Sequence, residues 1–113
     1  MTLVVRAYPV KSRKAVDEFV TELRERRGEV QQFFASFNVA RETWHYQETP
    51  HGAIVIGVTE VKGPVEPVAR AYKETEERFA AWFKQRVLDI SGVNPNETPL
   101  GPDTEMVFDS TDV

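Results

Sequence analysis

The stretch that decides the fold reads VARETWHYQETPHGAIVIGVT and covers residues 39–59. Its side chains alternate with a period of two between residues 39 and 49, which indicates a strand with one wetter face. Thr49-Pro-His-Gly52 then places proline and glycine where a tight turn prefers them. Residues 53–59 are apolar on both faces, which is typical of a strand in the middle of a sheet. The stretch therefore predicts an antiparallel hairpin with a central second strand.

The flanking segments supply the remaining predicted elements. Residues 2–8 are apolar at nearly every position, so they also predict a central strand. Apolar residues at helical spacing predict one long helix from Ser12 to Phe37, with a weak point at Arg26-Arg27-Gly28 where a kink or a split could occur. A second long helix is predicted to end at Gly92, which suits a left-handed cap. A short last strand is predicted at residues 105–108 after a proline-rich connection.

This order of elements predicts an α+β fold of the ferredoxin-like type, β-α-β-β-α-β. The expected sheet has four antiparallel strands in the order 4-1-3-2, with two long helices on one face. One domain spans residues 1–113, of which residues 103–113 form the C-terminal strand and tail. Two helices can cover only one side of such a sheet. Its second apolar face therefore predicts a homodimer that forms through the sheet.

Over nearly its whole length the chain resembles the dimeric α/β-barrel superfamily. The resemblance is carried by the element order, by the C-terminal Val107-Phe108 strand, and by the aromatic residues of the second helix, Tyr72, Phe79, Trp82 and Phe83. It implies a small uncharacterised member in which two subunits pack sheet against sheet. The superfamily includes cofactor-independent monooxygenases, haem-degrading enzymes and muconolactone isomerase-like enzymes. It implies a site between sheet and helices or inside the barrel, and supplies no catalytic residue.

Composition excludes several classes of function. The chain has 113 residues, no cysteine and a net charge of −4, and its last twenty residues carry five acidic and no basic side chains. Disulfide scaffolds and thiolate chemistry are therefore excluded, and nucleic-acid binding is disfavoured. No apolar run approaches the roughly 20 residues of a membrane helix, and no secretory signal is evident. We therefore expect a cytoplasmic protein that binds neither membranes nor nucleic acids.

The candidate site follows from an assignment of sheet faces. If Ile54, Ile56, Val58, Trp44 and Tyr46 lie beneath the helices, the opposite face collects a polar set: Arg6, Tyr8, Thr43, His45, Gln47, Val55, Gly57 and Thr59. His45 is the candidate proton-transfer group, since imidazole titrates near neutral pH. Tyr8 is the second catalytic candidate, as a donor to developing negative charge. The substrate-binding candidates are Arg6, Thr43, Gln47 and Thr59.

Each of these candidates also has a structural explanation. His45 could be a half-exposed strand histidine, Arg6 could form a salt bridge within the chain or across a dimer, and Tyr8 could lie at an interface. His45, His51 and Glu48 lack the close spacing of strong metal sites, so neither a metal nor a cofactor is predicted. His45 would be the axial ligand if haem were bound.

Three functions stay open. The first is the binding of a small apolar or aromatic molecule between sheet and helices. The first alternative is a cofactor-independent monooxygenase or isomerase that uses His45 for proton transfer. The second is a ligand-sensing regulatory module.

Overall fold

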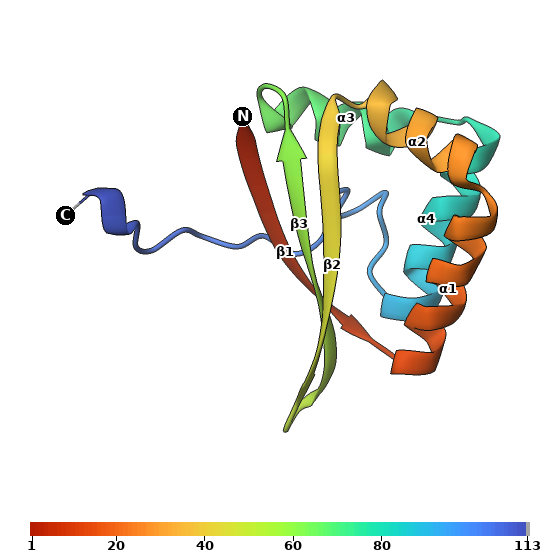
Figure 1. Ribbon diagram of the computed structural model, residues 1–113, viewed down its shortest axis with the longest axis horizontal. Coiled ribbons are helices and arrows are strands. Elements are labelled where there is room, and N and C mark those ends of the chain that lie inside the picture. Colours follow the sequence, from red (N-terminus) through yellow and green to blue (C-terminus); the bar gives the residue numbers. More distant parts are fainter. Residues whose placement is uncertain (113) are drawn as a thin grey trace.

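The computed structural model describes residues 1–112 as an α+β fold in which helices cover one face of a three-stranded antiparallel sheet (Figure 1). The strands are β1 (Thr2–Val10), β2 (Val39–Thr49) and β3 (Gly52–Val61). The helices are α1 (Arg13–Glu25), α2 (Arg27–Ser36), α3 (Val65–Glu74) and α4 (Arg78–Ser91), and a short 3-10 turn follows at Ser110–Asp112. Within the described chain, no helix combines the length and the apolar character needed to cross a membrane.

The predicted hairpin is confirmed. β2 and β3 pair antiparallel from Thr49↔Gly52 to Val39↔Val61, with a bulge between Val39 and Arg41. Gly52 follows the turn with φ of +122°, which only glycine adopts without strain. The sheet order is β1-β3-β2, so β3 is central as expected. β1 was also expected at the centre, and that expectation is wrong, because β1 forms an edge of the sheet.

The prediction of a four-stranded sheet is wrong because residues 105–108 do not pair with any strand. Thr104 donates a hydrogen bond from its side-chain hydroxyl to the carbonyl of Val5, so the chain meets β1 through one side chain. It then passes the edge of β1 and continues away from the sheet on the side opposite the helices (Figure 1). A chain that crosses an edge in this way cannot run alongside it and form a ladder of backbone hydrogen bonds.

The prediction of two long helices is also wrong, because each is divided. The first breaks at Arg26, where ψ of +37° interrupts the helix between α1 and α2. The Arg26 guanidinium lies 4.3 Å from the ring centroid of Trp82, so the break places this side chain over an aromatic surface. The second breaks at Thr75, whose extended backbone separates α3 from α4. Gly92 ends α4 in the left-handed conformation, as predicted.

A lysine on α4 stabilises the break between α3 and α4. The ammonium of Lys84 donates hydrogen bonds to the carbonyls of Lys73 and Thr75, at 3.0 and 3.3 Å. These carbonyls belong to the end of α3, where the helix itself offers no amide partner. The side chain of Lys84 is buried, and this burial lowers its pKa. A long polar side chain thus replaces the helical hydrogen bonds that the break removes.

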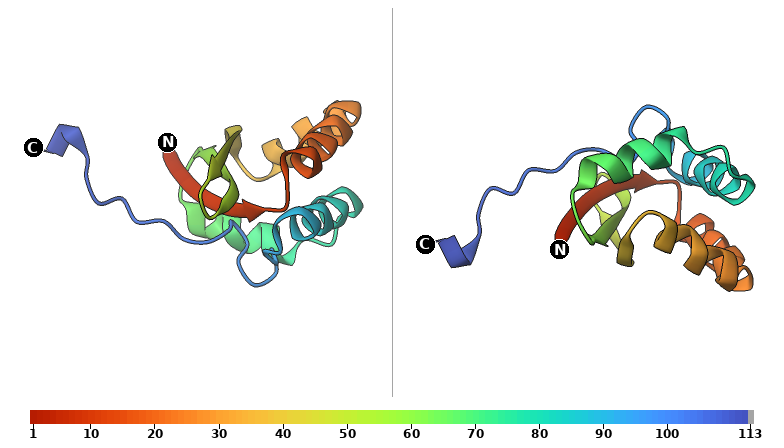
Figure 2. Two further views of the ribbon diagram at one scale, coloured as in Figure 1. Left: turned by 90° about the horizontal axis from the view of Figure 1, so that it is seen from below. Right: turned by 90° about the horizontal axis from the view of Figure 1, so that it is seen from above.

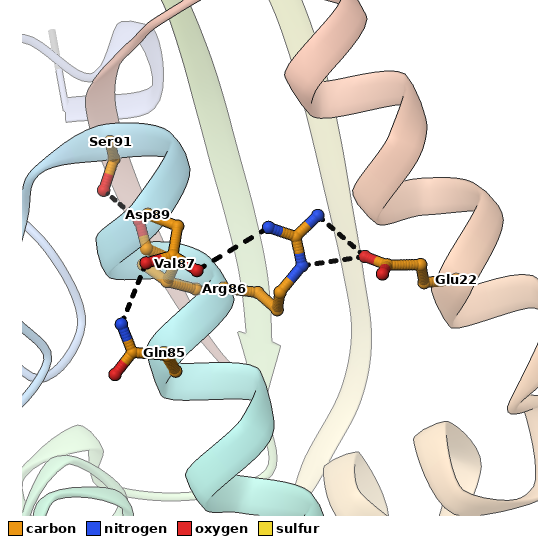
Figure 3. Close-up of polar contacts among 6 residues, drawn as sticks. All are labelled: Glu22, Gln85, Arg86, Val87, Asp89 and Ser91. Carbon is orange, nitrogen blue, oxygen red and sulfur yellow. Dashed lines mark hydrogen bonds and ion pairs between the residues drawn. The ribbon is translucent and has the colours of Figure 1, made fainter.

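The hydrophobic core lies between the sheet and the helices and is rich in aromatic residues. Phe19 of α1 is fully buried and lies 5.4 Å from the ring centroids of both Trp44 and Phe83. Above this core, the guanidinium of Arg86 on α4 binds the carboxylate of Glu22 on α1 at 2.8 Å (Figure 3). The ion pair links α1 to α4. The guanidinium of Arg86 also lies 5.4 Å from the ring centroid of Phe19.

Candidate functional site

A cavity of about 100 Å³ lies between the helix-facing side of the sheet and the helices. Its walls are mostly aromatic and aliphatic, and they come from all three strands, from all four helices and from the segment after α4. The apolar walls include Phe19, Phe33, Phe37, Val55, Val61, Phe83 and Leu100. Polar side chains also contribute to the lining: Arg6, Tyr8, Glu42, Thr59, Tyr72 and Ser91. A few polar groups in an otherwise apolar cavity are the usual composition of a small-molecule site.

Glu42 is the central polar group of this cavity. Its carboxylate accepts hydrogen bonds from the hydroxyl of Thr59 at 2.7 Å and from the indole N–H of Trp44 at 2.8 Å. Burial raises the pKa of Glu42, and the two hydrogen bonds oppose that shift in part. The strand positions explain the arrangement, since Glu42 and Thr59 are direct cross-strand partners on β2 and β3. The sheet thereby holds a carboxylate in a defined orientation in an apolar environment.

Two phenols share the cavity with this carboxylate. Burial raises the pKa of Tyr8 above its usual value, and the negative charge of Glu42 raises it further. The pKa of Tyr72 is raised in the same way, by burial first and then by Tyr8 and Glu42. Both phenols therefore keep their protons at physiological pH and act as hydrogen-bond donors. Because the charge of Glu42 acts on both hydroxyls, all three groups belong to one site.

Arg6 brings a positive charge to the same wall. One of its terminal nitrogens donates to the carbonyl of Val5 at 3.0 Å, and the other lies 3.5 Å from the carboxylate of Asp103. The Nε atom of Arg6 is buried and has no hydrogen-bond partner among the described residues. A buried donor without a partner is costly and uncommon in folded proteins. Arg6 therefore lines the cavity while its Nε donor stays unpaired among the described residues.

The segment after α4 closes the cavity beside Tyr8. Pro99 and Leu100 line it, and the backbone of Gly101 lies directly against the tyrosine ring. A Cβ atom at Gly101 would approach Cε1 of Tyr8 to 2.9 Å and other ring atoms more closely still. Only glycine allows this approach, and the φ of Gly101, +89°, also favours glycine.

The structure divides the six residues singled out from the sequence into two sets. Arg6, Tyr8 and Thr59 line the cavity. Thr43, His45 and Gln47 point to the opposite face of the sheet, here called the outer face, because neighbouring residues of a strand alternate between faces. His45 is exposed and contacts Thr43 Oγ1 at 3.0 Å through Nε2.

The two sets were expected on one face because the sequence-based assignment paired the two faces of β2 and β3 incorrectly. The assignment from sequence put Trp44 with Ile54, Ile56 and Val58 beneath the helices. In the sheet, however, Trp44 pairs with Gly57 and His45 pairs with Ile56. Trp44 therefore shares its face with Val55, Gly57 and Thr59, while the three aliphatic residues lie on the outer face with His45. Sequence alone cannot set the pairing register between two strands, which is why the two sets were combined incorrectly.

Sequence reasoning missed two residues of the site, Glu42 and Tyr72. A signal for Glu42 was present, since it shares its strand face with Trp44, and a carboxylate among aromatic residues is unusual on a covered face. Tyr72 followed the apolar stripe of a helix and was interpreted as a core residue. It is indeed buried, yet it also lines the cavity.

The cavity residues offer no evident metal site. Within residues 1–112, no group of three histidine, cysteine, aspartate or glutamate side chains could hold a metal ion. Glu42 accepts from the Thr59 hydroxyl and the Trp44 indole, and two phenols and a guanidinium on the same cavity wall are further hydrogen-bond donors. The arrangement is suited to recognise an uncharged polar group on an otherwise apolar molecule.

Comparison with known proteins finds no family model that matches the chain, and no curated protein or solved structure that is significantly similar to it.

Proposed function

We propose that the protein binds a small apolar or aromatic molecule, carrying one hydrogen-bonding group, in the cavity between sheet and helices. The observation that carries the proposal is the convergence of Glu42, Tyr8, Tyr72 and Arg6 on one apolar cavity, with the buried Nε of Arg6 left without a partner. Such polar groups cost stability when they are buried without partners. A ligand that supplies the missing partners recovers that cost.

Cavity size and chemistry together narrow the class of ligand. A cavity of about 100 Å³ is smaller than the ~150 Å³ apolar cavity that is known to accept benzene, so it accommodates one aromatic ring at most. Glu42 can accept a hydrogen bond from a ligand hydroxyl, while a tyrosine hydroxyl or Arg6 can donate one back. A substituted phenol meets these requirements, with its ring against the aromatic walls and its hydroxyl at Glu42.

The two alternative functions have less support from the geometry. His45 lies on the outer face, so it does not reach a ligand in this cavity. A monooxygenase or isomerase that uses His45 would need a second pocket on that face. A sensing module would be favoured by a cavity without converging titratable groups, whereas Glu42 and two tyrosines converge here. Binding through Glu42 is therefore the function that we adopt.

The proposal is tested by titration with 4-ethylphenol and with ethylbenzene, which differ only in the hydroxyl group. The chain has two tryptophans, of which Trp44 lines the cavity and Trp82 does not. A Trp82→Phe background therefore makes Trp44 the only indole reporter. Its emission, excited beyond the absorption of phenol, should change as either probe binds.

The Glu42→Gln variant in that background identifies the polar anchor. Where Glu42 is ionised, a hydrogen bond to it contributes about 1 kcal/mol more than a hydrogen bond to a neutral group, so 4-ethylphenol should bind the variant roughly fivefold more weakly. Ethylbenzene should bind with unchanged affinity. Glu48→Gln, an exposed position on the same strand, serves as the matched control. If neither probe binds the unaltered cavity, or if Glu42→Gln leaves the preference for the phenol intact, the proposal is wrong.

We also propose that the chain forms a homodimer through the outer face of the sheet. This proposal is supported by two large apolar side chains of β1, Leu3 and Val5, which are 60% and 40% exposed. On this face β3 contributes three aliphatic residues, Ile54, Ile56 and Val58, followed by Glu60 beside Leu3. An apolar patch with a charged residue at its margin is typical of a protein interface.

A further inference from the structure

The last residues of the chain form a C-terminal arm, residues 103–112, that leaves the body of the protein (Figure 2). Three consecutive large apolar residues of this arm, Met106, Val107 and Phe108, are 78%, 87% and 67% exposed. Exposed apolar residues are ordinary when they are scattered, but a run of three on a projecting segment indicates a binding surface. Residues 1–112 leave these three side chains mostly exposed to solvent.

The place where the arm leaves the body is defined by polar contacts. Thr104 donates a hydrogen bond to the carbonyl of Val5, and Asp103 lies 3.5 Å from the guanidinium of Arg6. Both contacts are at the free edge of β1. From there the arm extends on the side of the sheet that carries the outer face, opposite the helices (Figure 1). The arm and the apolar outer face are therefore presented in the same direction.

The two surfaces share an apolar centre with charged residues beside it. The arm carries Asp103, Glu105, Asp109 and Asp112 and no basic residue. The outer face carries Arg41 on β2 beside its cross-strand partner Glu60 on β3, and Arg41 forms no ion pair within the described part of the chain. An arm with an apolar centre matches the apolar part of this face, and Arg41 is available to an acidic residue of the arm. Both surfaces belong to one chain, so a two-fold axis would make the contact twice.

We propose that the C-terminal arm of each copy lies against the outer face of a second copy and closes the dimer. Met106 and Phe108 fall on the same side of an extended arm, because side chains alternate along it. They would cover Leu3 and Val5 of the other chain. This inference rests on the proposed homodimer and adds the element that holds it together. A face-to-face dimer without arm exchange would leave all three apolar arm residues in water.

The first test measures the mass of the protein in solution by size-exclusion chromatography with light scattering. The unaltered protein should have a mass in solution that is twice the 12.9 kDa of a single chain. The Met106→Ser/Phe108→Ser variant should be monomeric at concentrations at which the unaltered protein is fully dimeric. The control, Arg27→Ser/Gln31→Ser, shortens two exposed side chains of α2 and should remain dimeric. Far-UV circular dichroism reports whether each variant is folded.

A second measurement identifies the contact directly. The chain has no cysteine, so a disulfide that joins a tagged chain to an untagged chain can only link the two introduced thiols. Chains with Met106→Cys should crosslink to tagged chains with Val5→Cys under mild oxidation, giving a product of distinct mass. The same arm variant should not crosslink to tagged chains with Gln31→Cys, which places the thiol on α2.

The possible results separate the two proposals. A monomeric unaltered chain at all concentrations would contradict both the homodimer and the arm exchange. A dimer that survives Met106→Ser/Phe108→Ser and fails to crosslink between positions 106 and 5 would contradict the arm exchange alone. If the arm variant does not fold, the crosslink between full-length chains still decides the question, since its presence supports the exchange and its absence contradicts it.

Discussion

Thr59 of β3 donates a hydrogen bond of 2.7 Å to the carboxylate of Glu42, its direct cross-strand partner on β2. This bond orients the only carboxylate that lines the cavity in the described structure. The bond joins residues 17 positions apart in the chain, so it exists only when the hairpin has its native register. The stability of the hairpin and the shape of the candidate site are therefore coupled.

Replacement of Thr59 by valine keeps the shape of the side chain and removes the donor. Because Glu42 then loses one of its two donors, the free energy of unfolding should fall by about 1–3 kcal/mol. Urea denaturation measures this change. Thr43→Val, on the outer face of the same hairpin, is the matched control and should change stability by less than ~0.5 kcal/mol. Equal effects of the two substitutions would contradict a special role for the Thr59–Glu42 bond.

The raised pKa of Glu42 predicts a dependence of stability on pH. Above the ordinary carboxyl pKa of 4.5, the folded chain keeps a proton on Glu42 that the unfolded chain releases. This contribution therefore makes the free energy of unfolding fall as pH rises from 4.5 through the raised pKa. Glu42→Gln should abolish this fall and be more stable than the unaltered protein at the upper end of the range.

The difference between the two unfolding curves isolates this effect from other carboxylates. Glu29, for example, has its pKa lowered by Arg26, so its contribution has the opposite sign and is present in both proteins. Chemical denaturation at a series of pH values provides the measurement. A constant stability difference between the two proteins across the range would show that Glu42 titrates normally.

Two glycines with left-handed backbones should respond differently to alanine. At Gly92, φ is +73° and the surrounding space is open, so Gly92→Ala should cost about 1–2 kcal/mol from backbone strain alone. At Gly101, φ is +89° and a Cβ atom would collide with Tyr8. Gly101→Ala should therefore cost at least ~1 kcal/mol more than Gly92→Ala, as expected for an overpacked site. Thermal unfolding of both variants tests this difference, and equal costs would mean that Tyr8 moves aside freely.

A third glycine allows the cavity to be made smaller. Gly57 lines the cavity, and a Cβ atom there would lie 3.9 Å from the indole of Trp44, an ordinary contact. Gly57→Ala should raise the free energy of unfolding by about 0.5–1 kcal/mol, because glycine weakens a strand interior. It should also weaken the binding of 4-ethylphenol. Gly63→Ala, where a Cβ atom meets no neighbour, should leave binding unchanged. Unchanged binding by Gly57→Ala would place the ligand elsewhere.

The elements that depend on local sequence were predicted well. The hairpin of β2 and β3 follows from alternation and from the turn at Thr49–Gly52, and the cap at Gly92 follows from the need for a left-handed residue. The possible break near Arg26 was also visible, although the extended Thr75 between α3 and α4 was not. Thr75 is followed by two glutamates, which are also common in helices, so the helical periodicity did not indicate a break at Thr75.

The candidate site was predicted only in part. Arg6, Tyr8 and Thr59 line the cavity, whereas His45 does not, because the cross-strand register places it on the outer face. The carboxylate of Glu42 is oriented by two hydrogen-bond donors, Trp44 on the same strand and Thr59 on the neighbouring strand β3. Neither relationship can be obtained from spacing along the chain.

The amino-acid sequence by itself determined which segments form strands and helices, since these depend on side-chain periodicity and on turn residues within a few positions of one another. Only the tertiary structure decided that β1 is an edge, that the C-terminal arm leaves the sheet, and that a carboxylate and two phenols meet in one cavity. These features depend on pairing between distant segments. Several pairings satisfy the same hydrophobic pattern, and the packing of the whole chain selects among them.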